Sequence, residues 1–157
     1  MKEKLPQNIQ NLLMEIGEKS VLFKLFLLTK ENMGWEVYHN LNDTGYDIVL
    51  LKKQTFEKVR IEVKTRQRLY TTSNSNNKKS VHYTITKNEF ENSDFIIAYW
   101  FEKNYYFIVP TSELRETSSN SIPVYKFIVR EMADGSIDEK SKYYLENWDL
   151  ILKRIGK

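Results

Sequence analysis

Two apolar stretches of the chain carry charged residues that could act on a phosphodiester. Asp47 precedes the apolar run 48–51, and Glu62 and Lys64 alternate with Ile61 and Val63 in the segment 60–65. Carboxylate oxygens are hard ligands of the kind that Mg²⁺ prefers. A lysine beside them could orient or deprotonate an attacking water, or neutralise charge that builds up on a phosphate. These residues therefore predict a divalent-metal phosphodiesterase site.

The polar segment 52–58 between the two stretches is short enough to be the turn of a β-hairpin, which would bring the two acids onto neighbouring strands. Within the second strand, the two-residue period places Glu62 and Lys64 on one face and Val63 on the other. Two interpretations without a metal ion are also possible for these residues. Asp47 could be an ordinary aspartate at a strand start, and Glu62 and Lys64 could form a surface ion pair.

Composition limits the chemistry that the chain can perform. It has 157 residues, which predicts a single domain over 1–157 with a core of its own. There is no cysteine and only two histidines, His39 and His82. Disulfides, thiolate chemistry and zinc sites with several histidines are excluded. Neither a signal peptide nor an apolar run long enough to cross a bilayer is present, so we expect a soluble cytoplasmic protein without a membrane partner.

The net charge of +3 says little about partners, whereas the distribution of charge is informative. Arg66, Arg68, Lys78 and Lys79 follow the candidate acids, and we expect them to contact the phosphates of a nucleic acid. The alternative for each of them is a solvated surface charge. His39 ends a predicted strand near the acids, where a satisfied hydrogen-bonding role is favoured over a phosphate contact.

Periodicity and capping signals predict an α/β fold with a mixed central β-sheet flanked by helices. A first helix over 8–33 would pack on the sheet, with Gly17 as a bend and Gly34 as its C-cap. Seven apolar residues at mostly helical spacing predict the packed face of this helix: Ile9, Leu12, Leu13, Ile16, Phe23, Phe26 and Leu27. The further elements are expected over 35–39, 81–85, 86–92, 94–101, 105–109, 112–116, 124–129 and 143–155, with an exposed loop over 71–80.

This order of elements, with an acid on one strand and Glu-x-Lys on the next, resembles the PD-(D/E)XK nuclease superfamily, over about 16–109. The resemblance implies a restriction-endonuclease-like core in which Asp47 is the first acid, Glu62 the second and Lys64 the lysine. It further implies that Glu18 is an extra helix acid reaching toward a metal-bound water, and that Gln67 contacts site or substrate. Tyr46 stands where the family's motif has proline.

The resemblance also implies Mg²⁺ as the cofactor, with Mn²⁺ able to substitute. We expect Asp47, Glu62 and the Val63 carbonyl to bind the ion, without any small-molecule cofactor. The leading hypothesis is a metal-dependent DNA endonuclease, restriction-like or junction-resolving, that acts as a homodimer because cutting two strands requires two active sites. The alternative is a catalytically inactive nuclease-fold module that binds nucleic acid or a protein. A nuclease acting on RNA would differ only in its substrate.

Overall fold

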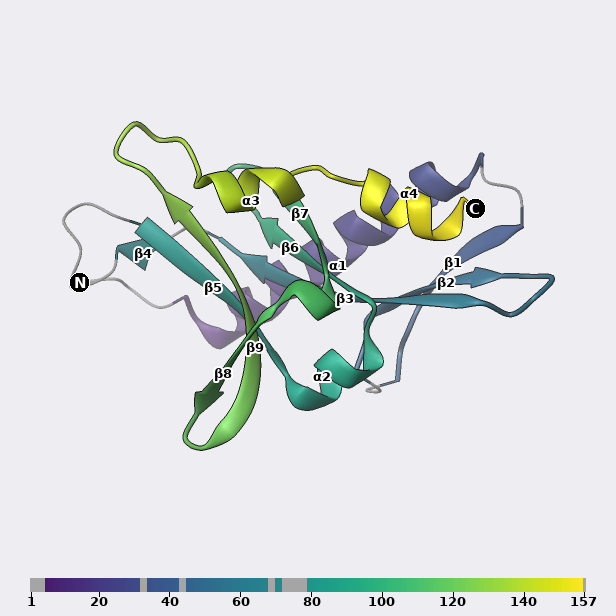
Figure 1. Cartoon of the computed structure of the whole chain (residues 1–157), viewed down its shortest axis with the longest axis horizontal. Coiled ribbons are helices and arrows are strands. Elements are labelled where there is room, and N and C mark those ends of the chain that lie inside the picture. Colours follow the sequence, from purple (N-terminus) through teal and green to yellow (C-terminus); the bar gives the residue numbers. More distant parts are fainter. Residues whose placement is uncertain (1–4, 32–33, 43–44, 68–69, 72–78, 157) are drawn as a thin grey trace.

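The structure, a computed structural model, describes residues 5–31, 34–42, 45–67, 70–71 and 79–156, and it contains two β-sheets with helices around them (Figure 1). The five-stranded sheet, sheet A, has the order β1-β2-β3-β6-β7. Its strands are β1 (Trp35–His39), β2 (Ile48–Lys52), β3 (Lys58–Arg66), β6 (Phe95–Trp100) and β7 (Tyr105–Pro110). The four-stranded sheet, sheet B, has the order β4-β5-β9-β8 and consists of β4 (Tyr70–Thr71), β5 (Lys79–Thr86), β8 (Arg115–Ser119) and β9 (Ile122–Glu131).

The helices lie around these sheets. They are α1 (Gln7–Thr29), α2 (Lys87–Asn92), α3 (Glu139–Tyr144) and α4 (Asp149–Ile155), with a short 3₁₀ helix η1 (Thr111–Glu113). Sheet A is mixed, because β3 and β6 are parallel while its other pairs are antiparallel. This confirms the predicted mixed sheet with flanking helices, and the predicted hairpins β2-β3 and β6-β7 are both present. No helix among the described residues is long and apolar enough to cross a bilayer.

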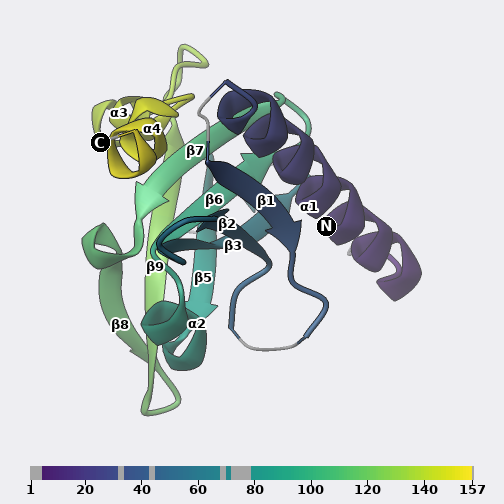
Figure 2. The ribbon, with the colours of Figure 1, turned by 90° about the vertical axis from the view of Figure 1, so that its right-hand side faces the viewer.

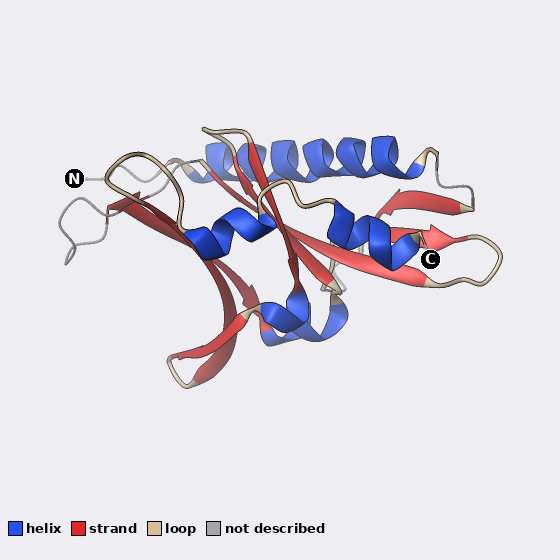
Figure 3. Cartoon of the chain, turned by 45° about the horizontal axis from the view of Figure 1, so that its top comes forward, coloured by secondary structure: helices blue, strands red, loops and turns tan. Residues whose placement is uncertain are grey.

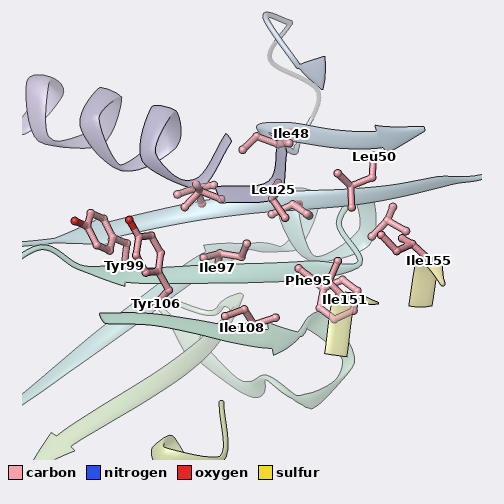
Figure 4. Close-up of a cluster of buried hydrophobic side chains, with 14 of the residues drawn as sticks. Leu25, Ile48, Leu50, Phe95, Ile97, Tyr99, Tyr106, Ile108, Ile151 and Ile155 are labelled. Carbon is pink, nitrogen blue, oxygen red and sulfur yellow. The ribbon is translucent and has the colours of Figure 1, made fainter. Parts of the chain in front are cut away.

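Two apolar cores lie on opposite faces of sheet A. The first packs α1 and α4 against one face through residues such as Leu25, Ile61, Ile97 and Ile151 (Figure 4). The second fills the space between the two sheets. Sheet B was not expected as a separate layer, since the sequence indicated strands at 81–85 and 124–129 without showing which strands they pair with.

The prediction of which face of α1 packs on the sheet was wrong. The residues of this helix that are buried are Gly17, Val21, Leu25 and Thr29, which recur every four positions. Of the seven residues expected to pack, six are exposed: Ile9, Leu12, Ile16, Phe23, Phe26 and Leu27. The helix is apolar on two opposite sides, so the apolar periodicity did not identify the side that faces the protein.

Gly17 does not bend α1, which is continuous from Gln7 to Thr29. A Cβ atom on Gly17 would lie 1.8 Å from the Oγ1 atom of Thr65 in β3. The glycine therefore permits close contact between the helix and the sheet. The helix also ends earlier than predicted. Lys30 is its C-cap, and Gly34, with φ +100°, lies in the turn immediately before β1.

Three further predictions need correction or lie beyond the described residues. The segment 112–116 is only partly helical, because η1 ends at Glu113 and β8 begins at Arg115. The closing helix is two helices, since Glu146 adopts a φ of +51° and Leu145 bridges to Phe107 in β7. The prediction of a loop over 71–80 was wrong at both ends, because Thr71 belongs to β4 and Lys79 and Ser80 belong to β5, while residues 72–78 lie outside the described residues.

Candidate active site

Asp47 is held immediately before β2 by backbone and side-chain hydrogen bonds. Its N–H donates to the Ile61 carbonyl at 2.9 Å, and its Oδ2 atom accepts from the Val63 N–H at 2.7 Å. The turn before it requires Gly45, which has a φ of +88° and lies close to α2. These contacts fix one carboxylate oxygen of Asp47 against β3.

Glu62 and Lys64 project from one face of β3, as the strand period predicts. Glu62 is only 5% exposed. The Lys64 Nζ atom lies 3.1 Å from the Glu62 Oε1 atom. The ammonium thus lies against one of the predicted metal ligands, and the pair of a buried Glu62 and a partly buried Lys64 is not an exposed surface ion pair.

Glu89 is a member of this cluster that the sequence analysis missed. Its Oε2 atom accepts a hydrogen bond from Lys64 Nζ at 2.8 Å, while its Oε1 atom accepts from the Thr86 N–H at 2.9 Å. The Thr86 side chain accepts in turn from the Glu89 N–H, which completes the capping box of α2. The Thr-x-x-Glu pattern correctly predicted a helix start. The signal for a second role was the position of this acid directly after β5.

An open cavity of about 350 Å³ joins these residues. It is lined by Met14, Glu18, Asp47, Glu62, Val63, Lys64, Thr65, Arg66, Thr84 and Glu89. The predicted first acid, second acid, lysine and helix acid therefore meet in one place. They come from α1, from β3 and from the position immediately before β2, which are separated along the chain, and α2 adds Glu89.

Glu18 reaches this cavity from α1 and is anchored at the end of β1. Its Oε2 atom lies 3.3 Å from the Nε2 atom of His39, and each side chain is about a quarter exposed. His39 therefore has the hydrogen-bonding role that the sequence favoured. The charge of Glu18 acts on Asp47 across the cavity.

Burial and the crowding of like charges perturb the acids. Burial, together with the charge of Glu18, raises the pKa of Asp47 to about 6, although the hydrogen bond from the Val63 N–H opposes this rise. Burial, a hydrogen bond to Glu89 and the charge of Asp47 raise the pKa of Glu62 to about 10. In the absence of another cation, Glu62 therefore retains a proton at neutral pH, and crowded carboxylates of this kind are stabilised by a bound cation.

The other two groups of the cluster favour their charged forms. For Lys64, burial opposes the ammonium, but the charges of Glu62 and Glu89 outweigh burial and leave its pKa raised. For Glu89, burial opposes ionisation, but hydrogen bonds with Glu62, Lys64 and the Thr86 N–H lower its pKa to about 2. The resting cavity thus contains a charged Lys64–Glu89 pair.

The donor atoms fit a hard divalent cation. Asp47 and Glu62 offer carboxylate oxygens, and Mg²⁺ binds through one or two such groups while it keeps several waters. Among the residues that the structure describes, no group of three or more His, Asp or Glu side chains forms a ready cation cage.

The remaining predicted residues lie in different places. Arg66 lines the cavity, with its guanidinium 5.9 Å from the centre of the Tyr83 ring. Gln67 lines hollows beside the N-terminal half of α1 and is not part of the cavity lining. The Lys79 Nζ atom lies 3.9 Å from the Glu131 carboxylate at the far end of β5. The predicted nucleic-acid contacts Arg68 and Lys78 lie outside the described residues.

Sheet B carries a group of cations that the sequence did not single out. The sheet B cations are Arg115 of β8 and Lys126 and Arg130 of β9, and none forms an ion pair with a carboxylate in the described part of the chain. They line a hollow of about 270 Å³. Lys126 stands between Arg115 and Thr84 in the register of the sheet, and Thr84 lines the acidic cavity. Partial burial and the charges of all three cations lower the pKa of His82.

The fold of the chain was compared with those of known proteins. No family model and no curated protein matches the chain. Among solved structures it is similar to the bacterial homing endonuclease I-Ssp6803I, with a TM-score of 0.62 and 19% identity over 93% of each chain. It is also similar to Hjc, a Holliday junction resolvase from the archaeal hyperthermophile Archaeoglobus fulgidus, with a TM-score of 0.54 and 16% identity over 92% of this chain and 96% of the other. The chain therefore has the restriction-endonuclease-like fold of the PD-(D/E)XK nucleases.

Proposed function

We propose that this chain, as a single nuclease-like domain, is a metal-dependent DNA endonuclease that hydrolyses phosphodiester bonds. The observation that carries the proposal is the meeting of Asp47, Glu62 and Lys64 in one cavity of a nuclease fold. A domain that only binds DNA gains nothing from buried acids beside the phosphate, because they repel it. The structural neighbours, a homing endonuclease and a junction resolvase, are consistent with either a restriction-like or a junction-resolving enzyme.

Asp47, Glu62 and the Val63 carbonyl would hold Mg²⁺ or Mn²⁺, which acts as a Lewis acid on the phosphate and lowers the pKa of bound water. The Val63 N–H orients the Asp47 carboxylate through its hydrogen bond. Glu18, held by His39, would orient a water in the cavity. Each of these roles uses a hydrogen-bonded or buried side chain, so little reorganisation is needed before substrate binds.

Lys64 would stabilise the negative charge that develops on the phosphate. Its ammonium lies against both Glu62 and the charged Glu89 in the resting cavity, and its raised pKa keeps it charged at neutral pH. Glu89 is a positioning residue, because it holds Lys64 from the fixed start of α2. Substrate or metal that draws Glu62 away would leave Lys64 anchored by Glu89 alone.

DNA as the substrate is supported by cations in the cavity and on the neighbouring strands of sheet B. Arg66 lines the cavity itself, and we propose that Arg68, Lys78 and Lys79 add phosphate contacts, while Gln67 contacts substrate at the margin of the cavity. The sheet B cations extend positive charge across β9 and β8 from Thr84. Phosphate contacts of this kind position a duplex without reading its sequence.

Cleavage of a panel of nucleic acids tests the proposal. Supercoiled plasmid, four-way DNA junctions, single-stranded DNA and RNA are incubated with the protein and Mg²⁺ or Mn²⁺, with chelator as the blank. We expect metal-dependent cleavage of DNA, and loss of at least roughly 100-fold in rate for Asp47→Ala and for Lys64→Ala. Lys58→Ala is the matched control, because Lys58 lies on the same strand and is exposed. Absence of cleavage by the wild-type chain, or equal rates for all variants, contradicts the proposal.

We also propose that two copies act together. A single cavity cuts one strand, so a cut through both strands requires a second active site.

A further inference from the structure

The outer side of α1 is an exposed apolar surface. Phe23 is 62% exposed, Phe26 55% and Leu12 49%, and Ile9, Ile16 and Leu27 are exposed as well. These residues lie on the side of the helix opposite to Val21 and Leu25, which pack on sheet A. Figures 2 and 3 show α1 at the outside of the fold, with sheet A on one side of it and no helix or strand of the described residues covering the opposite side.

One apolar face is sufficient to hold α1 on the sheet. A helix that is apolar on two sides normally has both sides covered. A continuous apolar patch on a soluble protein marks an interaction surface, because its exposure to water is costly. The outer side of α1 is therefore a candidate interaction surface.

The spacing of the exposed residues indicates what kind of partner fits. Ile9, Leu12, Ile16, Phe23 and Phe26 stand at alternating intervals of three and four positions, with Lys19 completing the series. This is the a/d pattern of a coiled-coil seam, whose natural partner is another helix with the same pattern. We call these six residues the α1 seam.

We propose that the α1 seam binds the α1 seam of a second copy of this chain, with the two helices antiparallel. An a/d series is symmetric under reversal, so Leu12 of each copy meets Phe23 of the other, and Ile9 meets Phe26. In this register Lys19 of one copy lies beside Ile16 and Glu15 of the other. The only charge within the seam therefore meets an opposite charge, twice per dimer.

A hollow beside the seam supports this arrangement. It has a volume of about 160 Å³ and is lined by Leu5, Ile9, Leu12, Leu13, Ile16, Gln67 and Phe101. Phe101, which is 42% exposed, extends the apolar surface beyond the helix. In the antiparallel register, Phe23 of the second copy faces Leu12 and covers this hollow. In this arrangement the hollow receives Phe23, the most exposed apolar side chain of the seam.

The proposed interface does not cover the cavity that contains Asp47, Glu62 and Lys64. Met14 and Glu18, which reach the cavity from α1, are not part of the seam. The inference rests on the α1 surface and not on nuclease activity. It specifies the contact for the pair of active sites that the proposed function requires.

Sedimentation velocity of the full chain without DNA or metal tests the proposal. We expect the wild-type chain to be a dimer at micromolar concentration and Phe23→Asp to weaken dimerisation by roughly 100-fold or more. Phe56→Asp is the control, because Phe56 is 73% exposed but lies in the β2-β3 turn. A monomeric wild-type chain would show that something else covers α1, and a dimeric Phe23→Asp variant would also overturn the proposal.

A charge exchange tests the antiparallel register. Glu15→Lys and Lys19→Glu should each raise the dissociation constant on the order of tenfold, since each places like charges at two contacts. Mixing the two variants should restore dimers, and native mass spectrometry should identify them as heterodimers. If the mixture stays monomeric, or if each variant dimerises as the wild type does, the register is wrong. Because neither assay measures cleavage, an inactive protein would leave this inference standing.

Discussion

One substitution can separate the contact of Glu89 with Lys64 from its contribution to the capping box of α2. Glutamine at position 89 keeps one carbonyl oxygen, which can still accept from the Thr86 N–H, as capping boxes with glutamine do. Its amide group then faces Lys64 with a donor where the wild-type chain has an acceptor at 2.8 Å. Glu89→Gln therefore removes the Lys64 anchor and preserves the start of α2.

The expected magnitudes follow from these contacts. The lost bond between charged groups is of the kind that contributes about 1.5–3 kcal/mol. Partners that orient active-site residues typically change activity by roughly 10- to 100-fold when they are replaced. We expect a loss of this size in the cleavage rate of Glu89→Gln. Because the charge of Glu89 helps to keep the pKa of Lys64 raised, the high-pH limb of the rate profile should also move to lower pH.

Thr86→Ala supplies the control. It removes the side chain that accepts from the Glu89 N–H, and should cost about 1 kcal/mol of stability through the helix cap. The Lys64 contact remains, so the cleavage rate should stay near that of the wild-type chain at temperatures well below unfolding. Single-turnover rates and thermal melts of both variants make the comparison. Equal rates for Glu89→Gln and the wild-type chain, or an equal loss in Thr86→Ala, would refute this reasoning.

Three other predictions concern stability and binding. Since the pKa of Asp47 is raised to about 6, the free energy of unfolding without metal should fall as the pH rises from about 4 to 6. Asp47→Asn should recover roughly 1–3 kcal/mol above that range in thermal melts with chelator. A difference in stability between the two proteins that does not change with pH contradicts this. Replacing the three sheet B cations with glutamine should weaken DNA binding and reduce the slope of log K against log salt by about 3, whereas an unchanged slope places DNA elsewhere. Gly17→Ala should destabilise the fold by about 1–3 kcal/mol because its Cβ meets Thr65, and Thr65→Ala in the same chain should recover part of the loss in urea unfolding.

The parts of the fold that depend on local signals were predictable. The alternation in 35–39 gave the bounds of β1, and the Thr-x-x-Glu box gave the start of α2. The closing helix was not predictable, because its break depends on a positive φ at Glu146 and on the bridge from Leu145 to β7. Neither feature leaves a periodic signal in the sequence. The separation of sheet B likewise depends on pairings between distant strands.

In the candidate site too, residues with a local sequence signal were predictable, whereas a contact between distant segments was not. Asp47, Glu62 and Lys64 could be identified because their spacing and strand period are local, and Glu18 followed from the family resemblance. Glu89 was assigned only to the capping box, because its contact with Lys64 spans 25 positions and appears only when β5 and β3 come together. The outward side of α1 was assigned to the core for a related reason. Periodicity shows that a helix face is apolar without showing what covers it.

Manganese binding tests the central claim most directly, because the claim is that Asp47 and Glu62 hold a divalent ion beside Lys64. Crystals soaked in Mn²⁺ are measured by anomalous diffraction, for the wild-type chain and for Asp47→Ala. We predict an anomalous peak in the cavity between the two carboxylates and the Val63 carbonyl, absent from the variant. A cavity without such a peak at saturating Mn²⁺, or a peak bound by other residues, would contradict the account.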